Sequence, residues 1–246
     1  MSKQIIFGLH AVTALLNKQP ERIIHLYVYE DRKDKKLETL LQLARKRGLE
    51  IKAVSRQELD RMTHDGNHQG VAAMCHATQT YSENNLAELL QQLTVPPFLL
   101  LLDGVQDPHN LGACFRTADA AGVHAIIAPK DKAVGITPVV SKVACGATET
   151  VPFVQVTNLA RAMEQIKEAG VWLYGADADA TESLYQTKLT GAIGMVMGAE
   201  GSGLRRLTRE LCDVLLKIPM TGSVSSLNVS VATGIFLFEA VRQRSK

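Results

Sequence analysis

Short apolar runs alternate with helical patterns through the second half of the chain. The first run, 98–102, is wholly apolar, which is typical of a strand covered on both faces. Alternation of this kind predicts a parallel sheet with helices packed against it. The strands expected after the first one are 124–128, 153–156, 171–176, 194–197 and 214–218, and the expected helices are 111–121, 137–145, 159–169, 204–211 and 228–244.

The front of the chain predicts a smaller α/β unit, which we place at residues 1–76. Residues 77–97 are polar at first, then carry a short helical pattern and end on Pro96-Pro97, so we interpret them as a linker. The second expected domain is then 98–246. In the front unit, helices are predicted at 8–17, 33–47 and 56–61, and strands at 23–28, 49–54 and 71–76.

Composition narrows the class of protein without naming a partner. With 246 residues and 46% hydrophobic content, the chain can bury a proper core. Its four cysteines form no CxxC pair, which argues against a zinc site or a disulfide framework. No window approaches the roughly 20 apolar residues of a membrane span, and we expect a soluble cytoplasmic protein without a membrane partner. A net charge of +2 fits nucleic-acid binding but does not argue for it.

One loop of the front unit gathers side chains that can bind metal. It reads THDGNHQG and includes His64, Asp65, Asn67, His68 and Gln69. Asp, Asn and Gly also favour tight turns, and no third strong ligand is evident. We therefore predict a turn and no metal.

The exit of the first buried strand carries the first candidate site residues. Asn110 is expected at the cap of the following helix, with Arg116 six residues further on. A buried or half-buried arginine on an otherwise apolar helix usually has an anionic partner. That partner is either a ligand or an internal acid, Asp119 or Asp103.

The exit of the strand 194–197 is a glycine-rich turn, GAEGSG, that holds Glu200. Glycines such as Gly198, Gly201 and Gly203 allow the backbone to approach a ligand. The turn is neither a P-loop nor a GxGxxG fingerprint, so it does not favour a nucleotide-dependent oxidoreductase.

A third exit follows the last strand and reads IPMTGSVSSLNVSVATG. Ser226 and Asn228 suit a helix start, because their short side chains accept hydrogen bonds from the first free N–H groups. The stretch alone is compatible with an ordinary capped C-terminal helix. Ligands of parallel sheets bind at the carboxyl ends of the strands, so the three exits together predict one composite site.

Three motifs, NLGACFRTADAAG, MGAEGSGL and IPMTGSVSSLNVSVATGI, closely resemble those of the SpoU/TrmH family of RNA 2'-O-ribose methyltransferases. FGLHAV and NHQGV resemble the L30e-like RNA-binding domain of those bacterial members that methylate a guanosine of large-subunit rRNA. The resemblance implies a SPOUT methyltransferase domain with a deep C-terminal trefoil knot. It also implies S-adenosylmethionine as methyl donor, no metal, and a homodimer.

By matching position, the resemblance also assigns roles to residues. The implied reaction is 2'-O-methylation of a guanosine of 23S rRNA, in the peptidyl transferase P-loop region. A tRNA substrate remains an alternative, as does a non-catalytic rRNA-binding assembly factor. Three further arginines, Arg205, Arg206 and Arg209, are candidates for RNA phosphate contacts. The implied catalytic residues are Asn110, Arg116, Glu200, Ser226 and Asn228, and the implied cofactor-binding residues are Gly198, Ile218, Met220, Ser226 and Leu227.

Overall fold

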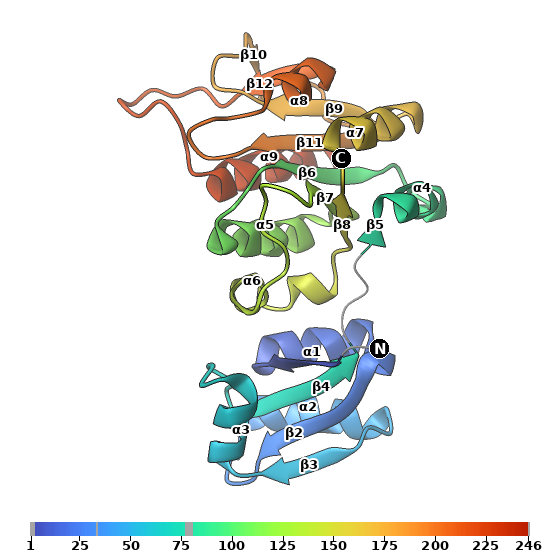
Figure 1. Ribbon diagram of the computed structural model, residues 1–246, viewed down its shortest axis with the longest axis vertical. Helices are drawn as coiled ribbons and strands as arrows, with labels where there is room; N and C mark the ends of the chain where they lie inside the picture. The colour runs from blue at the N-terminus through green and yellow to red at the C-terminus, as the bar shows by residue number, and fades with distance from the viewer. Residues whose placement is uncertain (1–2, 33, 77–80, 246) are drawn as a thin grey trace. The chain divides into compact units, whose positions relative to one another are not determined.

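A computed structural model describes residues 3–32, 34–76 and 81–245 (Figure 1). The chain divides into two compact units. The first takes Met1–Gln79 together with Cys145–Thr150, and the second takes Thr80–Ala144 and Val151–Lys246. The stretch expected as a linker therefore contributes β5 (Tyr81–Ser82) and α4 (Glu83–Gln92) to the second unit.

The first unit is built on a four-stranded mixed sheet in the order β1-β4-β2-β3. β4 runs antiparallel to both neighbours, whereas β2 and β3 are parallel. The edge strand β1 was not predicted, because its five residues carry too short an apolar pattern. The elements are β1 (Lys3–Phe7), α1 (Leu9–Lys18), η1 (Pro20–Arg22), β2 (Ile23–Tyr29), α2 (Lys35–Lys46), β3 (Ile51–Val54), α3 (Arg56–Thr63), β4 (Val71–His76) and the short η2 (Ala147–Glu149).

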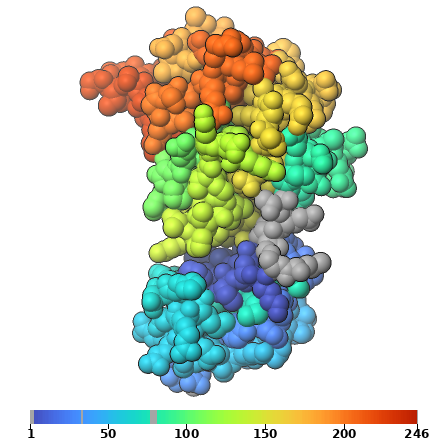
Figure 2. Space-filling view, viewed as in Figure 1, coloured from blue at the N-terminus to red at the C-terminus, as the bar shows by residue number. Residues whose placement is uncertain are grey.

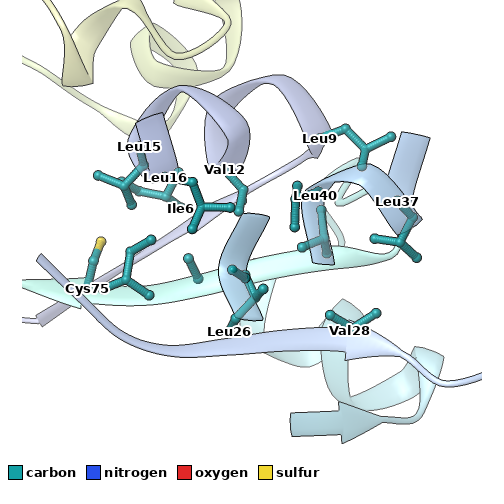
Figure 3. Packing of buried hydrophobic residues seen from close by; sticks show 14 residues of the cluster. Ile6, Leu9, Val12, Leu15, Leu16, Leu26, Val28, Leu37, Leu40 and Cys75 are labelled. Carbon is teal, nitrogen blue, oxygen red and sulfur yellow. The ribbon is translucent and has the colours of Figure 1, made fainter. Parts of the chain in front are cut away.

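The core of this unit lies between the sheet and the helices α1 and α2. Figure 3 shows Leu15 and Leu16 of α1 and Leu37 and Leu40 of α2 above the strands. A smaller cluster around Leu59 of α3 covers other strand residues. These helices bury their apolar stripes against the sheet, which removes both surfaces from water.

The second unit carries an eight-stranded sheet in the order β10-β12-β9-β11-β6-β7-β8-β5. Every pairing is parallel, which confirms the predicted sheet class. The two-residue strands β5 and β10 were missed, because so short a segment has no measurable periodicity. The remaining strands are β6 (Phe98–Asp103), β7 (Ala125–Pro129), β8 (Phe153–Val156), β9 (Trp172–Ala176), β10 (Glu182–Ser183), β11 (Ile193–Gly198) and β12 (Val214–Lys217).

Helices pack against this sheet in two groups. One group includes α5, which packs against α6 and α9. The other contains α4, α7 and α8, whose apolar residues join a cluster that includes Leu99, Val154 and Val196 of the strands. The helices are α5 (Pro108–Ala121), α6 (Pro138–Ala144), α7 (Leu159–Glu168), α8 (Arg206–Leu211) and α9 (Val229–Arg244).

The path from β12 to α9 crosses the sheet. β12 lies next to the edge strand β10, whereas α9 packs against the central strand β11 and against α5. Residues 218–228 make this crossing, so the third motif spans the carboxyl ends of several strands.

Candidate functional site

The first exit lies between β6 and α5. β6 ends on the buried Asp103, and Gly104 follows with φ +86°, a conformation that glycine adopts without strain. Asp107 caps α5 by accepting a hydrogen bond of 2.8 Å from the His109 backbone N–H. The expectation that Asn110 sits at the cap is therefore wrong. Pro108 opens the helix one turn earlier, and Asn110 is buried inside that first turn.

The second exit is a turn closed by its own backbone. Ala199 and Gly203 exchange hydrogen bonds of 3.1 and 3.0 Å, and Glu200 projects from the turn between them. Gly198, the last residue of β11, lies directly beneath. A Cβ there would come within 2.1 Å of the carbonyl carbon of Gly203, so only glycine fits.

The third exit confirms the predicted helix start. Asn228 is the N-cap of α9 and accepts hydrogen bonds from the backbone N–H groups of Ser230 (2.9 Å) and Val231 (3.4 Å). One turn later the buried Thr233 accepts from the Cys114 thiol of α5 at 3.6 Å. Burial raises the pKa of Cys114 to about 11, so the thiol keeps the proton that it donates. This contact joins the middle of α5 to the first half of α9.

Side chains from all three exits bond to one another. Asn110 Nδ2 donates to Glu200 Oε1 at 3.0 Å, and Asn228 Nδ2 donates to Asn110 Oδ1 at 3.0 Å. Asn228 Nδ2 also donates to Glu200 Oε1. We name Asn110, Glu200 and Asn228 the polar triad. Glu200 and Asn228 lie 90 and 118 positions from Asn110 along the sequence, so the fold alone brings the three residues together.

A cavity of about 380 Å³ opens beside the polar triad. This volume falls in the range of roughly 300 to 1,000 Å³ that is common for small-ligand sites. Its lining includes Asn110, Glu200 and Val229 as well as Gly104, Lys132 and Arg205. Lys132 and Arg205 give the cavity two cationic side chains close to the triad.

Arg116 does not occupy the expected environment. It is exposed, because helical geometry places it with Asp119 and Ala120 on the outer face of α5. The expectation of a buried or half-buried arginine is wrong for this reason. Asp103, one of the internal partners considered for Arg116, pairs instead with Arg205 at 3.5 Å.

The residues expected to bind cofactor are less tightly gathered. Gly198 ends β11 and Ile218 follows β12, and both strands pair in parallel with β9, so their ends share one edge of the sheet. Ile218 and Leu227 are half-buried, whereas Met220 and Ser226 are exposed. In Figures 1 and 2 the orange-red loop after β12 stands out from the body of the unit. Neither Met220 nor Ser226 takes part in the polar triad.

Sequence reasoning missed Asp103 and Lys132 as parts of the cavity, and it named Arg205 only within a cluster of three candidate RNA contacts. Asp103 carried a usable signal, since it is an acid that ends a wholly apolar strand. Lys132 lies in a loop without regular structure, where no periodicity marks it.

Within the described ranges, no group of three His, Cys, Asp or Glu side chains could hold a metal ion. None of the helices described is both long and apolar enough to cross a bilayer. In the first unit, His68 instead stabilises its turn. Its Nε2 lies 2.9 Å from Asp60 Oδ1, and its Nδ1 accepts from Gly70 N–H at 3.0 Å.

Comparison with known proteins assigns the fold and the motifs to a family. Residues 97–238 match the SpoU rRNA Methylase family. The chain belongs to this family. Residues 5–81 match a second description, RNA 2'-O ribose methyltransferase substrate binding, so both units of this SpoU protein have counterparts.

Similar SpoU proteins cover the chain from end to end. It is 58% identical over 245 residues to the 23S rRNA (guanosine-2'-O-)-methyltransferase RlmB of Shewanella oneidensis, covering 99% of each chain. It is 53% identical to RlmB of Escherichia coli K12, covering 98% of this chain and 99% of that one. The AdoMet-bound rRNA methyltransferase of Sinorhizobium meliloti is 26% identical with a TM-score of 0.77, covering 98% of this chain and 87% of that one.

Proposed function

We propose that this protein transfers a methyl group from S-adenosylmethionine to the ribose 2'-hydroxyl of a guanosine in 23S rRNA. The polar triad carries the proposal, because it joins the three SpoU motifs at one point beside a cavity of ligand size. The names of the relatives at 53 to 58% identity supply the substrate. A protein with this task acts in the bacterial cytoplasm, where rRNA is processed.

The residues at the carboxyl edge of the sheet fit a methyl donor. Backbone groups at Gly198 and Ile218 lie at the ends of two strands that flank β9, and the half-buried Ile218 and Leu227 offer apolar contact. Met220 and Ser226 would complete the pocket from the exposed loop. An apolar pocket with a few fixed polar groups is the usual setting for such a ligand. S-adenosylmethionine supplies an electrophilic methyl on a sulfonium.

The chemistry makes one C–O bond at the ribose oxygen, breaks one C–S bond, and releases the hydroxyl proton to water. Positioning can supply roughly 7 to 11 kcal/mol of such a barrier. The polar triad holds the three strand exits of the site together. Arg116 is exposed on α5, where its guanidinium can contact an RNA phosphate while its charge stabilises the developing alkoxide. A guanidinium is a poor base at neutral pH, so we assign Arg116 no part in removing the hydroxyl proton.

Arg116→Lys tests this role. The charge stays but the planar fork is lost, so we expect turnover at neutral pH to fall by about tenfold or more with normal S-adenosylmethionine affinity. Near-normal turnover would remove the guanidinium from the mechanism.

We assign substrate choice to the front domain, residues 1–76, and methyl transfer to 98–246. The stretch 77–97 connects the two and contributes β5 and α4 to the second unit. Looped RNA is recognised by a shaped surface more than by net charge, and this chain carries only +2. Deleting 1–76 should abolish methylation of 23S rRNA while sparing S-adenosylmethionine binding. Retained site-specific methylation in the deletion variant would refute the assignment.

The proposed assembly is a homodimer of knotted SPOUT domains. The crossing from β12 to α9 supports the knot, since the chain passes from the margin of the sheet to its centre. An apolar stripe on α9 supports the dimer. Val231 and Phe238 are 50% and 48% exposed, with the half-buried Ile235 between them at helical spacing. Phe238→Glu should shift the mass in light scattering from dimer to monomer.

One assay tests the function as a whole. Labelled S-adenosylmethionine is offered with 23S rRNA and with tRNA, each from cells lacking the enzyme, and the modified ribose is mapped. We expect label in one guanosine of 23S rRNA. Label in tRNA alone would establish the tRNA alternative, and no transfer to either RNA would favour a non-catalytic rRNA-binding protein.

A further inference from the structure

Three arginines follow the second motif, and the structure separates them. Arg206 is 82% exposed and pairs with Glu210 at 2.7 Å along α8. Arg209 pairs with Asp177 at 2.5 Å. Arg205 differs from both, because it lines the cavity beside the polar triad. Sequence alone treats the three as one basic cluster.

Arg205 is held from two directions. Its backbone N–H donates to Asp103 Oδ2 at 2.9 Å, and its Nε lies 3.5 Å from Asp103 Oδ1. The guanidinium also lies over Gly104, where a Cβ would come within 2.9 Å of Nη2. These contacts place the start of the side chain firmly and direct the guanidinium toward Asp103 and Gly104.

Asp103 is a buried acid whose carboxylate is only partly paired. It is fully buried at the end of β6, and its Oδ1 accepts no hydrogen bond within the described part of the chain. A buried carboxylate is costly unless it is well paired, and 3.5 Å exceeds the roughly 2.7 to 2.9 Å of a strong charged hydrogen bond. The pair therefore orients the guanidinium without using up its donors.

The remaining N–H groups of the Arg205 guanidinium can bind an anion. Arginine carries five N–H groups, and Asp103 meets only the Nε side of the fork. The Arg205 side chain is still 47% exposed. Lys132 adds a second positive charge to the same cavity. Its loop is held to the first exit by the hydrogen bond from Val134 N–H to Val105 O at 2.9 Å.

We infer that Arg205, oriented by Asp103, is a positioning residue that binds an RNA phosphate next to the nucleotide being methylated. The inference rests on the proposed function and adds to it the group that seats the target ribose beside the polar triad. Among the three arginines it assigns this contact to Arg205 and not to Arg206.

Arg205→Gln and Arg206→Gln form a matched pair, since they remove the same charge from adjacent positions. Methyl transfer to 23S rRNA and RNA affinity are measured at several salt concentrations. For Arg205→Gln we expect KM for RNA to rise about tenfold and the slope of log affinity against log salt to fall by about 0.7 to 0.9, one phosphate contact. Arg206→Gln should stay within twofold of the wild type in both.

Two further variants separate positioning from folding. Arg205→Lys keeps the charge, so it should keep the salt slope and raise KM by a few fold. Asp103→Asn should raise KM without changing the slope, because the arginine is present but loosely held. If Arg205→Gln lowers Tm or S-adenosylmethionine affinity, Arg205→Lys decides: a raised KM with the slope retained supports the contact, and a wild-type KM overturns it.

The outcomes distinguish this inference from the proposed function. If wild-type protein transfers no methyl group to 23S rRNA, the proposed function fails. If the wild type is active and Arg205→Gln behaves like Arg206→Gln, the inference fails alone.

Discussion

The polar triad and the loop that follows β12 belong to the same proposed site, yet they are held in different ways. Asn110, Glu200 and Asn228 are bonded to one another across three strand exits. The loop residues from Met220 to Ser226 are exposed. In the proposed site, the polar triad is thus held by contacts within the protein. The exposed loop, which is proposed to bind the methyl donor, has room for contacts that a ligand would supply. A ligand that binds only the folded state stabilises that state. We therefore expect the loop to gain more stability than the polar triad when S-adenosylmethionine binds.

Two glycines from the two regions give the largest expected contrast. In Gly198→Ala the new methyl would meet the Gly203 backbone at 2.1 Å, so the turn that carries Glu200 must shift. We expect the free energy of unfolding to fall by about 3 kcal/mol and methyl transfer to be lost.

Gly222→Ala is the control from the loop. Its Cβ would meet nothing within 4 Å, and its φ is not positive. Its unfolding free energy should change by less than about 0.5 kcal/mol. Calorimetry of both variants checks the pair, and equal stability of the two would contradict the close packing at Gly198.

Removing the shared acceptor of the polar triad should cost activity more than stability. Glu200→Ala leaves the amide of the buried Asn110 without its acceptor, and the exposed Asn228 loses a partner. We expect unfolding to become easier by about 1 kcal/mol and kcat to fall about 100-fold through misplacement of the site.

Glu200→Gln keeps an acceptor oxygen and removes the charge. Comparing kcat of the two variants tells whether geometry or charge matters at this position. Full activity in Glu200→Ala would show that the triad is only structural.

Parts of this site follow from sequence, and the reasons are physical. The three exits could be predicted to meet, because carboxyl ends of parallel strands share an edge. The direct bonds between Asn110, Glu200 and Asn228 could not, since they depend on where Pro108 starts α5 and on how the turn at Gly198 closes.

Arg116 and Asp103 show two further limits of prediction from the sequence. Arg116 has apolar neighbours in sequence, but the rotation of the helix sets it on the exposed face. The partner of Asp103 is Arg205, 102 positions away, and no local pattern announces a contact at that separation. The two-residue strand β10 forms because it pairs with β12, and its own sequence is too short to predict it.

Asn228 has two tasks that a pair of variants can separate. Asn228→Asp keeps the oxygen that caps α9 but replaces the donor with a second carboxylate beside Glu200. Stability should stay near that of the wild type, while kcat falls about tenfold at neutral pH.

Lower pH should partly restore Asn228→Asp, because two neighbouring carboxylates raise the pKa of one and the protonated acid can donate again. Asn228→Ala, which loses the cap as well, should cost about 1 kcal/mol of stability and show no such recovery. A pH profile of kcat and a denaturant titration distinguish the two.

The smallest effect is expected in the exposed loop. Ser226 is exposed and lies outside the polar triad, so Ser226→Ala should leave the unfolding free energy within about 0.5 kcal/mol of the wild type. If the loop closes on S-adenosylmethionine as proposed, affinity measured by calorimetric titration should fall by a few fold, with RNA affinity unchanged. Ser223→Ala, three positions earlier in the same exposed stretch, is the matched control. Equal cofactor affinity in the two variants would remove Ser226 from the binding site and leave the polar triad as the ordered part of the third motif.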